Sequence, residues 1–258
     1  MRVILIGFGK VGQSLAEMLK FRHEELRKNY GLNLKVVAII DRGGAAISEK
    51  GISLSEALNA KKIGGSVSTL KDCGKLGLQA LEVLEEVEGD VAVEVTPTNL
   101  ETGEPGLSHI RKALTLGMHV VTTNKGPLAL SLPSLVDSAK RKGVLLRFSG
   151  AVGSAIPVLD FAETCLYGDR IESIRGVLNG TTNYILWRIH VEDPLCVNSA
   201  FNAVEFKYAY SGKHIPIGAR CQRERDGEFN HKRHHTYLPK TLKLTLVCEE
   251  NSLLRVTR

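Results

Sequence analysis

The sequence has no long apolar run, no cysteine framework and no internal repeat. No stretch approaches the roughly 18 consecutive apolar residues that a membrane-spanning helix needs, so no membrane partner is expected. The opening MRVILIGFG has an apolar run too short for a secretory signal peptide. The five cysteines show neither paired nor metal-type spacing, which favours free thiols in a reducing compartment. These absences predict a soluble, cytoplasmic protein.

The composition is globular, with 43% apolar and 24% charged residues, and 258 residues allow one or two domains. The net charge of +6 is unevenly placed. Residues 188–258 hold 12 of the 34 lysines and arginines but only 8 of the 28 acidic residues. The same segment holds five of the eight histidines, three of the five cysteines and only three of the 25 glycines. This shift is the strongest boundary in the sequence.

Short apolar segments alternate with helical apolar spacing through residues 1–150. Strands are expected at 2–6, 34–40, 90–95, 118–123 and 144–149. Helices are expected at 12–28, 105–116 and 132–142, and two more are expected, one that begins at Ser53 and one that ends near Gly89. Nearly continuous apolar strands that alternate with helices are typical of a doubly wound parallel sheet with helices on both faces. The predicted fold class is therefore α/β, with a dinucleotide-binding domain of the Rossmann type at 1–150.

A second, different unit is expected to begin at residue 151. Pro157 can open a helix that runs to about Leu166, and a strand is expected at 170–178. We interpret 151–187 as the start of an α+β domain for dimerisation and substrate binding. Residues 188–258 are interpreted as an atypical tail, disordered or frame-shifted, in which only 241–248 alternates like a strand.

The segment 7–12, GFGKVG, fits the pattern GxGxxG between a predicted strand and a predicted helix. Gly7 would allow a tight turn, Gly9 a close approach of pyrophosphate, and Gly12 close packing of the helix. The N-terminus of that helix offers amide donors and a positive dipole end. The pattern predicts a dinucleotide site, and the alternative is a glycine-rich turn without a ligand.

Two adjacent residues bear on the choice of dinucleotide. Asp41 ends the second strand and could accept the ribose 2′-hydroxyl of NAD. Arg42 follows at once and could meet the 2′-phosphate of NADP. We favour NADP, because the Arg-Gly-Gly loop can carry the aspartate away.

Polar residues follow three of the predicted strands, where ligands of open parallel sheets bind. Thr96 and Asn99 are suited to hydrogen-bond the edge of a nicotinamide ring. Lys125 would place a cation near the carbonyl being reduced, where it can stabilise an alkoxide and pass a proton. The alternative for Lys125 is a solvated surface charge.

Three motifs after the glycine turn carry a family resemblance. They are EVTPTNLETGEPGL (94–107), HVVTTNKGPLAL (119–130) and RGVLNGTTNYIL (175–186). In this order they resemble homoserine dehydrogenase, over residues 1 to about 187. The resemblance implies an enzyme that interconverts aspartate 4-semialdehyde and homoserine with NADH or NADPH, on the path to threonine and methionine.

The resemblance also implies roles for single residues. Phe8, Gly9 and Val11 would line the pyrophosphate and adenosine side of the cofactor, and Thr96 and Lys125 would contact the nicotinamide end. The turn Gly180-Thr181-Thr182 would face the bound cofactor. A sodium ion is implied at main-chain carbonyls, where Ser149 replaces a frequent glutamate of the family; the positions are Ser149, Val152, Ser154 and Ile156. Residues 170–178 would belong to a sheet used for homodimer formation.

The resemblance ends near Trp187. The family continues with a glutamate-rich stretch and an aspartate-containing segment with a second catalytic lysine, and the tail contains neither pattern. Lys207 and Lys213 stand in other contexts and receive no role. Alternatives for the tail are a zinc site from Cys196, Cys221, His231, His234, His235 and Cys248, a basic nucleic-acid arm, a divergent domain, or a truncated or frame-shifted end. We favour the last of these.

We therefore expect a homoserine dehydrogenase by descent, with a complete cofactor domain, an incomplete substrate domain and impaired turnover. The alternative is a non-catalytic NAD(P)-binding remnant or partner subunit, and a third possibility is another dehydrogenase of the same fold. The expected partners are a small-molecule substrate and a second copy of the chain, not nucleic acid.

Overall fold

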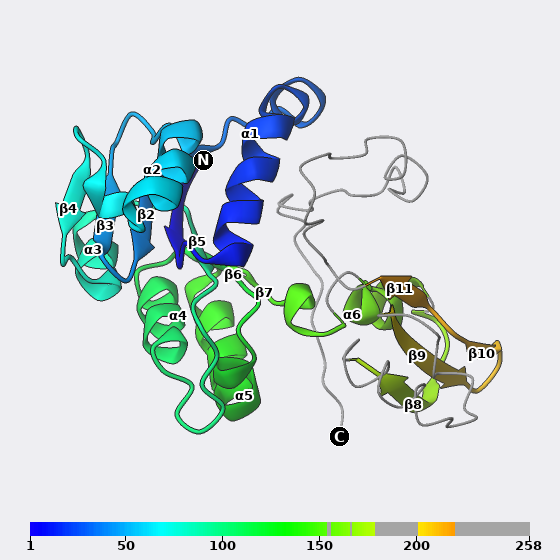
Figure 1. The fold of residues 1–258 in the computed structure, drawn as a ribbon. Helices are drawn as coiled ribbons and strands as arrows, with labels where there is room; N and C mark the ends of the chain where they lie inside the picture. Colours follow the sequence, from blue (N-terminus) through cyan, green and yellow to red (C-terminus); the bar gives the residue numbers. More distant parts are fainter. Residues whose placement is uncertain (154–155, 166, 179–200, 220–258) are drawn as a thin grey trace, which may run out of the picture. The chain divides into compact units, whose positions relative to one another are not determined.

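The computed structural model describes residues 1–153, 156–165, 167–178 and 201–219. The chain divides into two units, 1–220 and 221–258, and the second unit lies outside the described residues. No helix within the described ranges is long and apolar enough to cross a membrane. The described residues therefore comprise the predicted cofactor domain, called the first region below, and part of the chain that follows it, called the second region (Figure 1).

The first region is built on a seven-stranded sheet in the order β4-β3-β2-β1-β5-β6-β7. Its strands are β1 (Arg2–Ile6), β2 (Lys35–Asp41), β3 (Gly44–Ile47), β4 (Gly74–Leu76), β5 (Val91–Glu94), β6 (His119–Thr122) and β7 (Leu146–Arg147). The pairs β1–β2, β1–β5, β5–β6 and β6–β7 are parallel, which confirms the predicted doubly wound sheet. The chain order reverses at β1, so the switch point of the sheet lies between β1 and β5.

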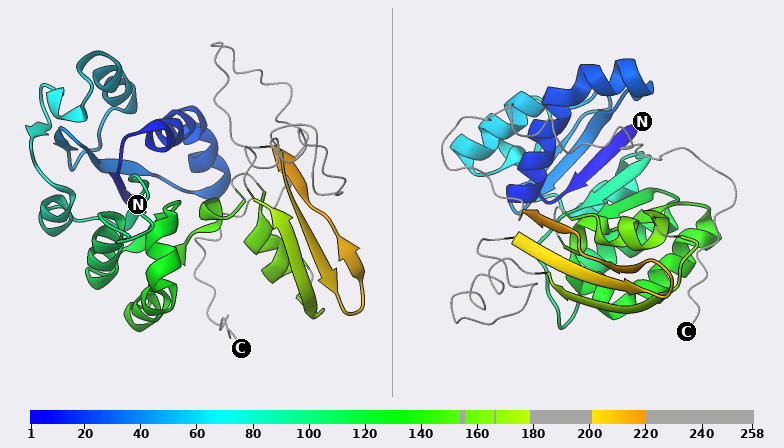
Figure 2. Two further views of the ribbon diagram at one scale, coloured as in Figure 1. Left: turned by 60° about the horizontal axis from the view of Figure 1, so that its bottom comes forward. Right: turned by 90° about the vertical axis from the view of Figure 1, so that its right-hand side faces the viewer.

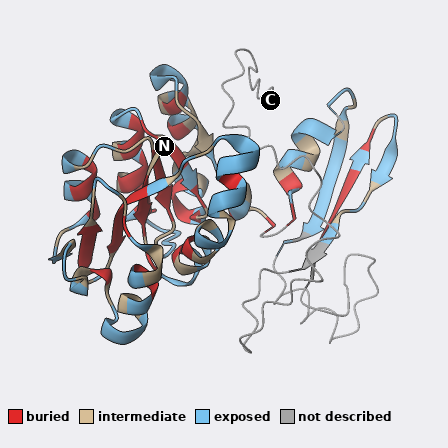
Figure 3. Ribbon diagram, turned by 90° about the horizontal axis from the view of Figure 1, so that it is seen from above, coloured by how far each residue is buried: buried red, intermediate tan, exposed pale blue. Residues whose placement is uncertain are grey.

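Helices cover both faces of this sheet, and strand alternation explains why. Side chains of β1 point alternately to opposite faces, so Val3 and Leu5 enter one apolar cluster and Ile4 and Ile6 another. The first cluster packs against α1 (Lys10–Tyr30) and α2 (Leu54–Gly64), and the second against α3 (Ala80–Glu86), α4 (Gly106–Thr115) and α5 (Lys125–Lys142). Figure 3 shows the strands as a buried layer.

Three details differ from the expectations. Strands β3 and β4 are antiparallel additions at one edge, whereas no strand was predicted there. Helix α5 begins at Lys125, seven positions before the predicted start at 132. Its first turn accepts Pro127 because a first-turn amide has no partner within the helix. Strand β7 keeps only two residues of the predicted 144–149.

The second region contains a four-stranded antiparallel sheet in which β9 pairs with β8, β10 and β11 (Figure 2). The strands are β8 (Ile171–Val177), β9 (Phe201–Tyr208), β10 (Gly212–His214) and β11 (Ile217–Ala219). A helical segment precedes them as α6 (Val158–Asp160) and one π-helical turn (Phe161–Cys165). A small core joins the two parts and consists of Ile156, Val158, Val204, Phe206 and Tyr208.

The sequence reading of the tail was incomplete for residues 201–219, where it assigned no strand. The missed signal was the alternation of Val204, Phe206 and Tyr208 with Glu205 and Lys207 along β9. The strand predicted at 241–248, the zinc alternative and the basic segment lie outside the described residues. Among those described, no group of three or more His, Cys, Asp or Glu could hold a metal.

Candidate functional site

The glycine turn after β1 is packed so closely that two of its positions exclude a side chain. Gly7 has φ +102°, and a Cβ there would lie 2.8 Å from the carbonyl carbon and oxygen of Val95, just after β5. A Cβ on Gly12 would lie 2.2 Å from the carbonyl oxygen of Gly7. The turn therefore sits at the switch point of the sheet, as the GxGxxG pattern predicts.

Gly9 differs, because a Cβ there would meet nothing within 4 Å. It precedes α1, whose N-terminus has no side-chain cap and no acidic residue in its first turn. An open approach to helix amides at a positive dipole end fits a pyrophosphate group. Val11 is exposed beside this opening, whereas the ring of Phe8 is buried in the core, which leaves its backbone for any contact with a cofactor.

Asp41 is held in place by four donors. One carboxylate oxygen accepts from the amide of Gly43 at 2.9 Å and the hydroxyl of Ser66 at 2.7 Å. The other accepts from Lys61 Nζ at 2.7 Å and the amide of Val67 at 3.1 Å. Burial raises the pKa of Asp41, but these hydrogen bonds together hold it below its usual value.

These contacts change the argument about the dinucleotide. The loop after Asp41 was expected to carry this carboxylate away, and instead the loop amide of Gly43 binds it. Lys61 nevertheless balances its charge, and Arg42 is exposed directly after it. A ribose phosphate would thus meet a neutralised aspartate and an arginine.

The ends of β5 and β6 are joined by Glu94, a buried glutamate that sequence reasoning missed. Its carboxylate accepts from the amide of Thr96 at 3.0 Å, from the Thr96 hydroxyl, and from the Thr122 hydroxyl at 2.9 Å. The side-chain amide of Asn124 lies 3.5 Å from the same carboxylate. An acidic residue at the end of the apolar strand DVAVE was the available signal.

Lys125 is the first residue of α5 and is exposed. Asn124 caps this helix, since its side-chain oxygen accepts from the amide of Gly126 at 3.3 Å and from the hydroxyl of Thr98 at 2.9 Å. The lysine therefore stands on a fixed helix start rather than on a loop. A Cβ on Gly126 would lie 2.0 Å from the carbonyl oxygen of Asn99, so the β5–α4 loop packs directly on this helix start.

Asn99 itself is used within its loop. Its side-chain oxygen accepts from the amides of Glu101 at 2.9 Å and Thr102 at 3.0 Å. The predicted contact of Asn99 with a nicotinamide would therefore fall to its amide nitrogen. Thr96 differs, because its hydroxyl donates a hydrogen bond to the carboxylate of Glu94.

The turn predicted to hold sodium is described in part. The carbonyl of Ser149 accepts from the amide of Val152 at 3.1 Å, and that of Ile156 from the amide of Val158 at 2.8 Å. Each carbonyl oxygen retains a second lone pair for a cation. Ser154 of this turn lies outside the described residues, as does the whole turn Gly180-Thr181-Thr182 that is predicted to face the cofactor.

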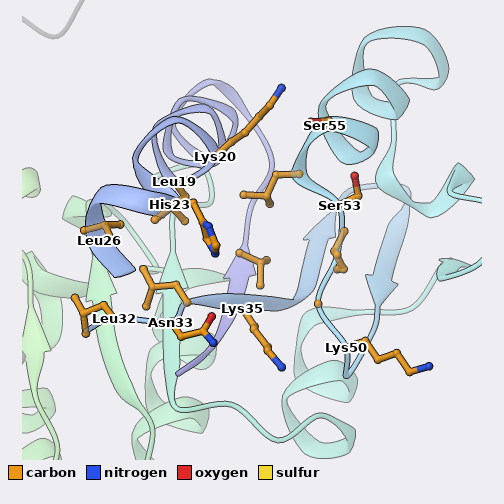
Figure 4. A pocket seen from close by; sticks show the side chains of 15 residues that line it. Leu19, Lys20, His23, Leu26, Leu32, Asn33, Lys35, Lys50, Ser53 and Ser55 are labelled. Atoms are coloured by element: carbon orange, nitrogen blue, oxygen red, sulfur yellow. The ribbon is translucent and has the colours of Figure 1, made fainter. Parts of the chain in front are cut away.

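A basic groove of about 590 Å³ lies elsewhere on the first region (Figure 4). It is bordered by α1, the start of β2 and residues 50–55. Lys20, His23 and Lys35 are among its lining side chains. Because β2 begins at Lys35, this groove is at the amino end of the parallel strands, away from the glycine turn.

Comparison with known proteins shows the family of the chain. The family model for the NAD-binding domain of homoserine dehydrogenase matches residues 7–149, and the model for homoserine dehydrogenase matches 157–209. The chain belongs to the homoserine dehydrogenase family. The second match reaches past Trp187, where the motif resemblance ended, and includes β9.

Two curated relatives give the extent of the similarity. Homoserine dehydrogenase of Methanocaldococcus jannaschii is 45% identical over 192 residues, which are 74% of this chain and 56% of that protein. NAD(+)-dependent homoserine dehydrogenase of Pseudomonas canavaninivorans is 34% identical over 194 residues, which are 72% of this chain and 53% of that protein. The chain thus spans about half the length of the curated relatives it matches.

A solved structure supports the fold. A hyperthermophilic archaeal homoserine dehydrogenase in complex with NADPH superposes with a TM-score of 0.74 at 21% identity. The match covers 84% of this chain and 91% of that chain.

Proposed function

We propose that this chain performs the homoserine dehydrogenase reaction, the NAD(P)-dependent interconversion of aspartate 4-semialdehyde and homoserine. The observation that carries the proposal is the meeting of three features at one edge of the sheet. They are the open glycine turn at Gly9, the Thr96 loop after β5, and Lys125 at the start of α5. The reaction belongs to the synthesis of threonine and methionine.

When bound, the dinucleotide supplies the hydride for aldehyde reduction or accepts it in reverse. Gly9 and the first amides of α1 bind the pyrophosphate, and Thr96 orients the nicotinamide end. The ammonium of Lys125 stabilises the aldehyde oxygen as it becomes an alkoxide and donates a proton to it. These roles need Lys125 exposed on a fixed base, which agrees with its place at the capped start of α5.

We further propose that turnover is weak. In the family, groups beyond the third motif hold the substrate amine and add a second lysine, and their pattern is absent from the sequence after Trp187. Loss of one member of a catalytic set commonly lowers rates by several powers of ten. The second candidate function is a non-catalytic NAD(P)-binding subunit. It follows if the first region binds the cofactor while the substrate-binding groups are missing from the second.

A turnover assay separates these possibilities. The full chain is assayed at high concentration with homoserine and NADP, alongside Lys125→Met and, as a control, Lys142→Met at the other end of α5. We expect slow turnover that falls by about a hundredfold in Lys125→Met and is unchanged in Lys142→Met. Equal turnover in both variants would remove Lys125 from the mechanism. Turnover within about tenfold of ordinary dehydrogenases would refute the subunit alternative.

Finer features belong to the same proposal. We favour NADP as cofactor, supported by Arg42 and by the neutralisation of Asp41 by Lys61. A sodium ion in the 149–156 turn would raise the melting temperature in sodium chloride over potassium chloride. A homodimer through 170–178 is supported by the exposure of residues 172–176. We also propose a cytoplasmic location, which the free thiols of the described cysteines, Cys73 and Cys165, support.

A further inference from the structure

Glu94 is a nearly fully buried carboxylate, 1% exposed, for which the proposed chemistry has no use. It ends β5, a strand whose other residues are apolar. Placing a carboxylate in a protein interior costs free energy unless hydrogen bonds compensate it. Its position therefore calls for an explanation in terms of the groups around it.

The donors around Glu94 come from two separate loops. One side of its carboxylate binds the amide and hydroxyl of Thr96, in the loop between β5 and α4. The other binds the hydroxyl of Thr122, which in turn accepts from the amide of Asn124 at 3.0 Å. Asn124 caps the helix that begins with Lys125. The carboxylate thus connects the Thr96 loop to the base of Lys125.

We infer that Glu94 is a positioning residue that holds Thr96 and the start of α5 at the spacing a nicotinamide ring requires. The inference rests on the proposed function. Glu94 is too buried to touch the cofactor, so it acts through Thr96, Thr122 and Asn124.

The donors around Glu94 favour a charged acceptor, because hydrogen bonds to a carboxylate are stronger than those to a neutral oxygen. The amide of Thr96, its hydroxyl, the hydroxyl of Thr122 and the side-chain amide of Asn124 all donate toward the carboxylate. The hydroxyl of Thr122 also lies 2.9 Å from the main-chain oxygen of Glu94, so it can donate there and accept from the NH₂ group of a glutamine. Glu94→Gln therefore preserves size and removes the negative charge that strengthens these hydrogen bonds.

The surroundings leave little room for a substitute. His109, on α4, is buried with its Nδ1 4.0 Å from Glu94 and has no hydrogen-bond partner for that atom among the described residues. Burial lowers the pKa of His109, while the neighbouring Glu94 and then Glu104 oppose this effect. A Cβ on Gly106 would lie 2.5 Å from the side-chain nitrogen of Asn124 and 3.2 Å from Glu94. The 4.0 Å separation from His109 and the close approach of Gly106 leave the loop donors as the hydrogen-bond partners of the carboxylate.

The test compares two ligands that differ in the nicotinamide. Dissociation constants of NADH and ADP-ribose are measured for the full chain, for Glu94→Gln and for the control Glu85→Gln, an exposed glutamate paired with Lys112. In Glu94→Gln we expect NADH to bind about tenfold more weakly, with ADP-ribose changed by less than about twofold. Glu85→Gln should change neither constant. If Glu94 had only a structural role, Glu94→Gln would weaken the binding of NADH and of ADP-ribose to the same extent.

A second pair of variants covers the case in which Glu94→Gln does not fold. Thr122→Val removes the hydroxyl that binds Glu94, and Thr122→Ser retains it. The valine should show the same selective loss of NADH affinity, and the serine should restore it. Equal losses for both ligands, or no loss in either variant, would overturn the role of Glu94. Failure of the unmodified chain to bind any of NADH, NADPH and ADP-ribose would instead overturn the proposed function together with this inference.

Discussion

The two described regions treat buried polar groups differently. In the first, the buried side chains of Glu94, Thr122 and Asn124 are joined by hydrogen bonds. In the second, the buried oxygens of Asn202 and Tyr208 have no hydrogen-bond partner among the described residues, whereas the first has one such atom, Nδ1 of His109. The first region also has two extended apolar clusters, one on each face of its sheet, whereas the second has a single cluster of five residues.

This comparison indicates which region satisfies its buried polar groups from within the described chain. Unpaired buried polar groups lower the stability of the folded state, and a small apolar core contributes little stabilising free energy to offset this. A sheet whose residues 172–176 are exposed can gain by meeting further surface. We therefore expect the first region to fold and bind a dinucleotide largely on its own account, and the second region to be the less stable of the two.

The largest effect is expected in the small core. Phe206 is fully buried and its ring lies 5.3 Å from that of Phe161. Phe206→Ala should destabilise the second region by about 4 kcal/mol, while NADH affinity stays unchanged. Urea unfolding and NADH titration check this, with the exposed Tyr210→Ala as control. A large loss of NADH affinity in Phe206→Ala would show that the two regions are not independent.

The next effect concerns the glycine turn. Gly12→Ala places a methyl group 2.2 Å from a backbone oxygen, so the turn must shift. We expect a loss of about 3 kcal/mol in the free energy of unfolding of the first region. The matched control is Gly168→Ala in the turn before β8, where a Cβ meets nothing within 4 Å. Similar unfolding curves for both variants would refute the close packing of the turn.

Each region has one aspartate that collects four hydrogen bonds, and a third comparison uses them. Asp41→Asn should cost about 2 kcal/mol at neutral pH. The folded pKa of Asp41 is below its usual value, so its contribution is complete above about pH 4 and is lost as the pH falls through the folded value. Unfolding at neutral and acid pH should therefore show a smaller decline in Asp41→Asn than in the unmodified chain, because the pKa values of Asp90 and Asp169 are also lowered.

Asp169 is the counterpart in the second region, where it binds the amides of Arg170, Tyr210 and Ser211 and the hydroxyl of Ser211. Desolvation raises the pKa of Asp169, but its four hydrogen bonds together hold the pKa below its usual value. Because this turn is exposed, Asp169→Asn should cost less than Asp41→Asn. The reverse order would contradict the assignment of the stronger polar network to the first region.

The smallest effect on stability is expected for Gly9→Ala, because nothing lies within 4 Å of the added methyl group. The same methyl group would lie where the pyrophosphate approaches, so the dissociation constant of NADH should rise by about tenfold or more. Titration and unfolding of one sample measure both quantities. Unchanged NADH affinity would remove Gly9 from the site.

The sequence predicted most of the first region because its signals are local. Apolar strands, the GxGxxG turn and the capping serine at Ser53 each act over a few residues, and Ser53 does accept from the amide of Glu56. Glu94 could not be predicted in the same way, because its partners Thr122 and Asn124 are about 30 residues distant and meet it only when β5 and β6 pair.

The edge strands and the second sheet were missed for related reasons. β3 begins with the second of two consecutive glycines and is short, so it resembles a loop in sequence. β9 carries Asn202 and Glu205 at buried positions, which weakens its apolar pattern. In both cases long-range pairing decides the structure, and pairing is not visible in a local pattern.

A crystal structure of the full chain with NADPH would test the central claim most directly, namely that the first region carries a complete dinucleotide site. The account predicts the pyrophosphate over Gly9 and the nicotinamide between Thr96 and Lys125. NADPH in the basic groove beside Lys35, or a nicotinamide remote from Lys125, would contradict it.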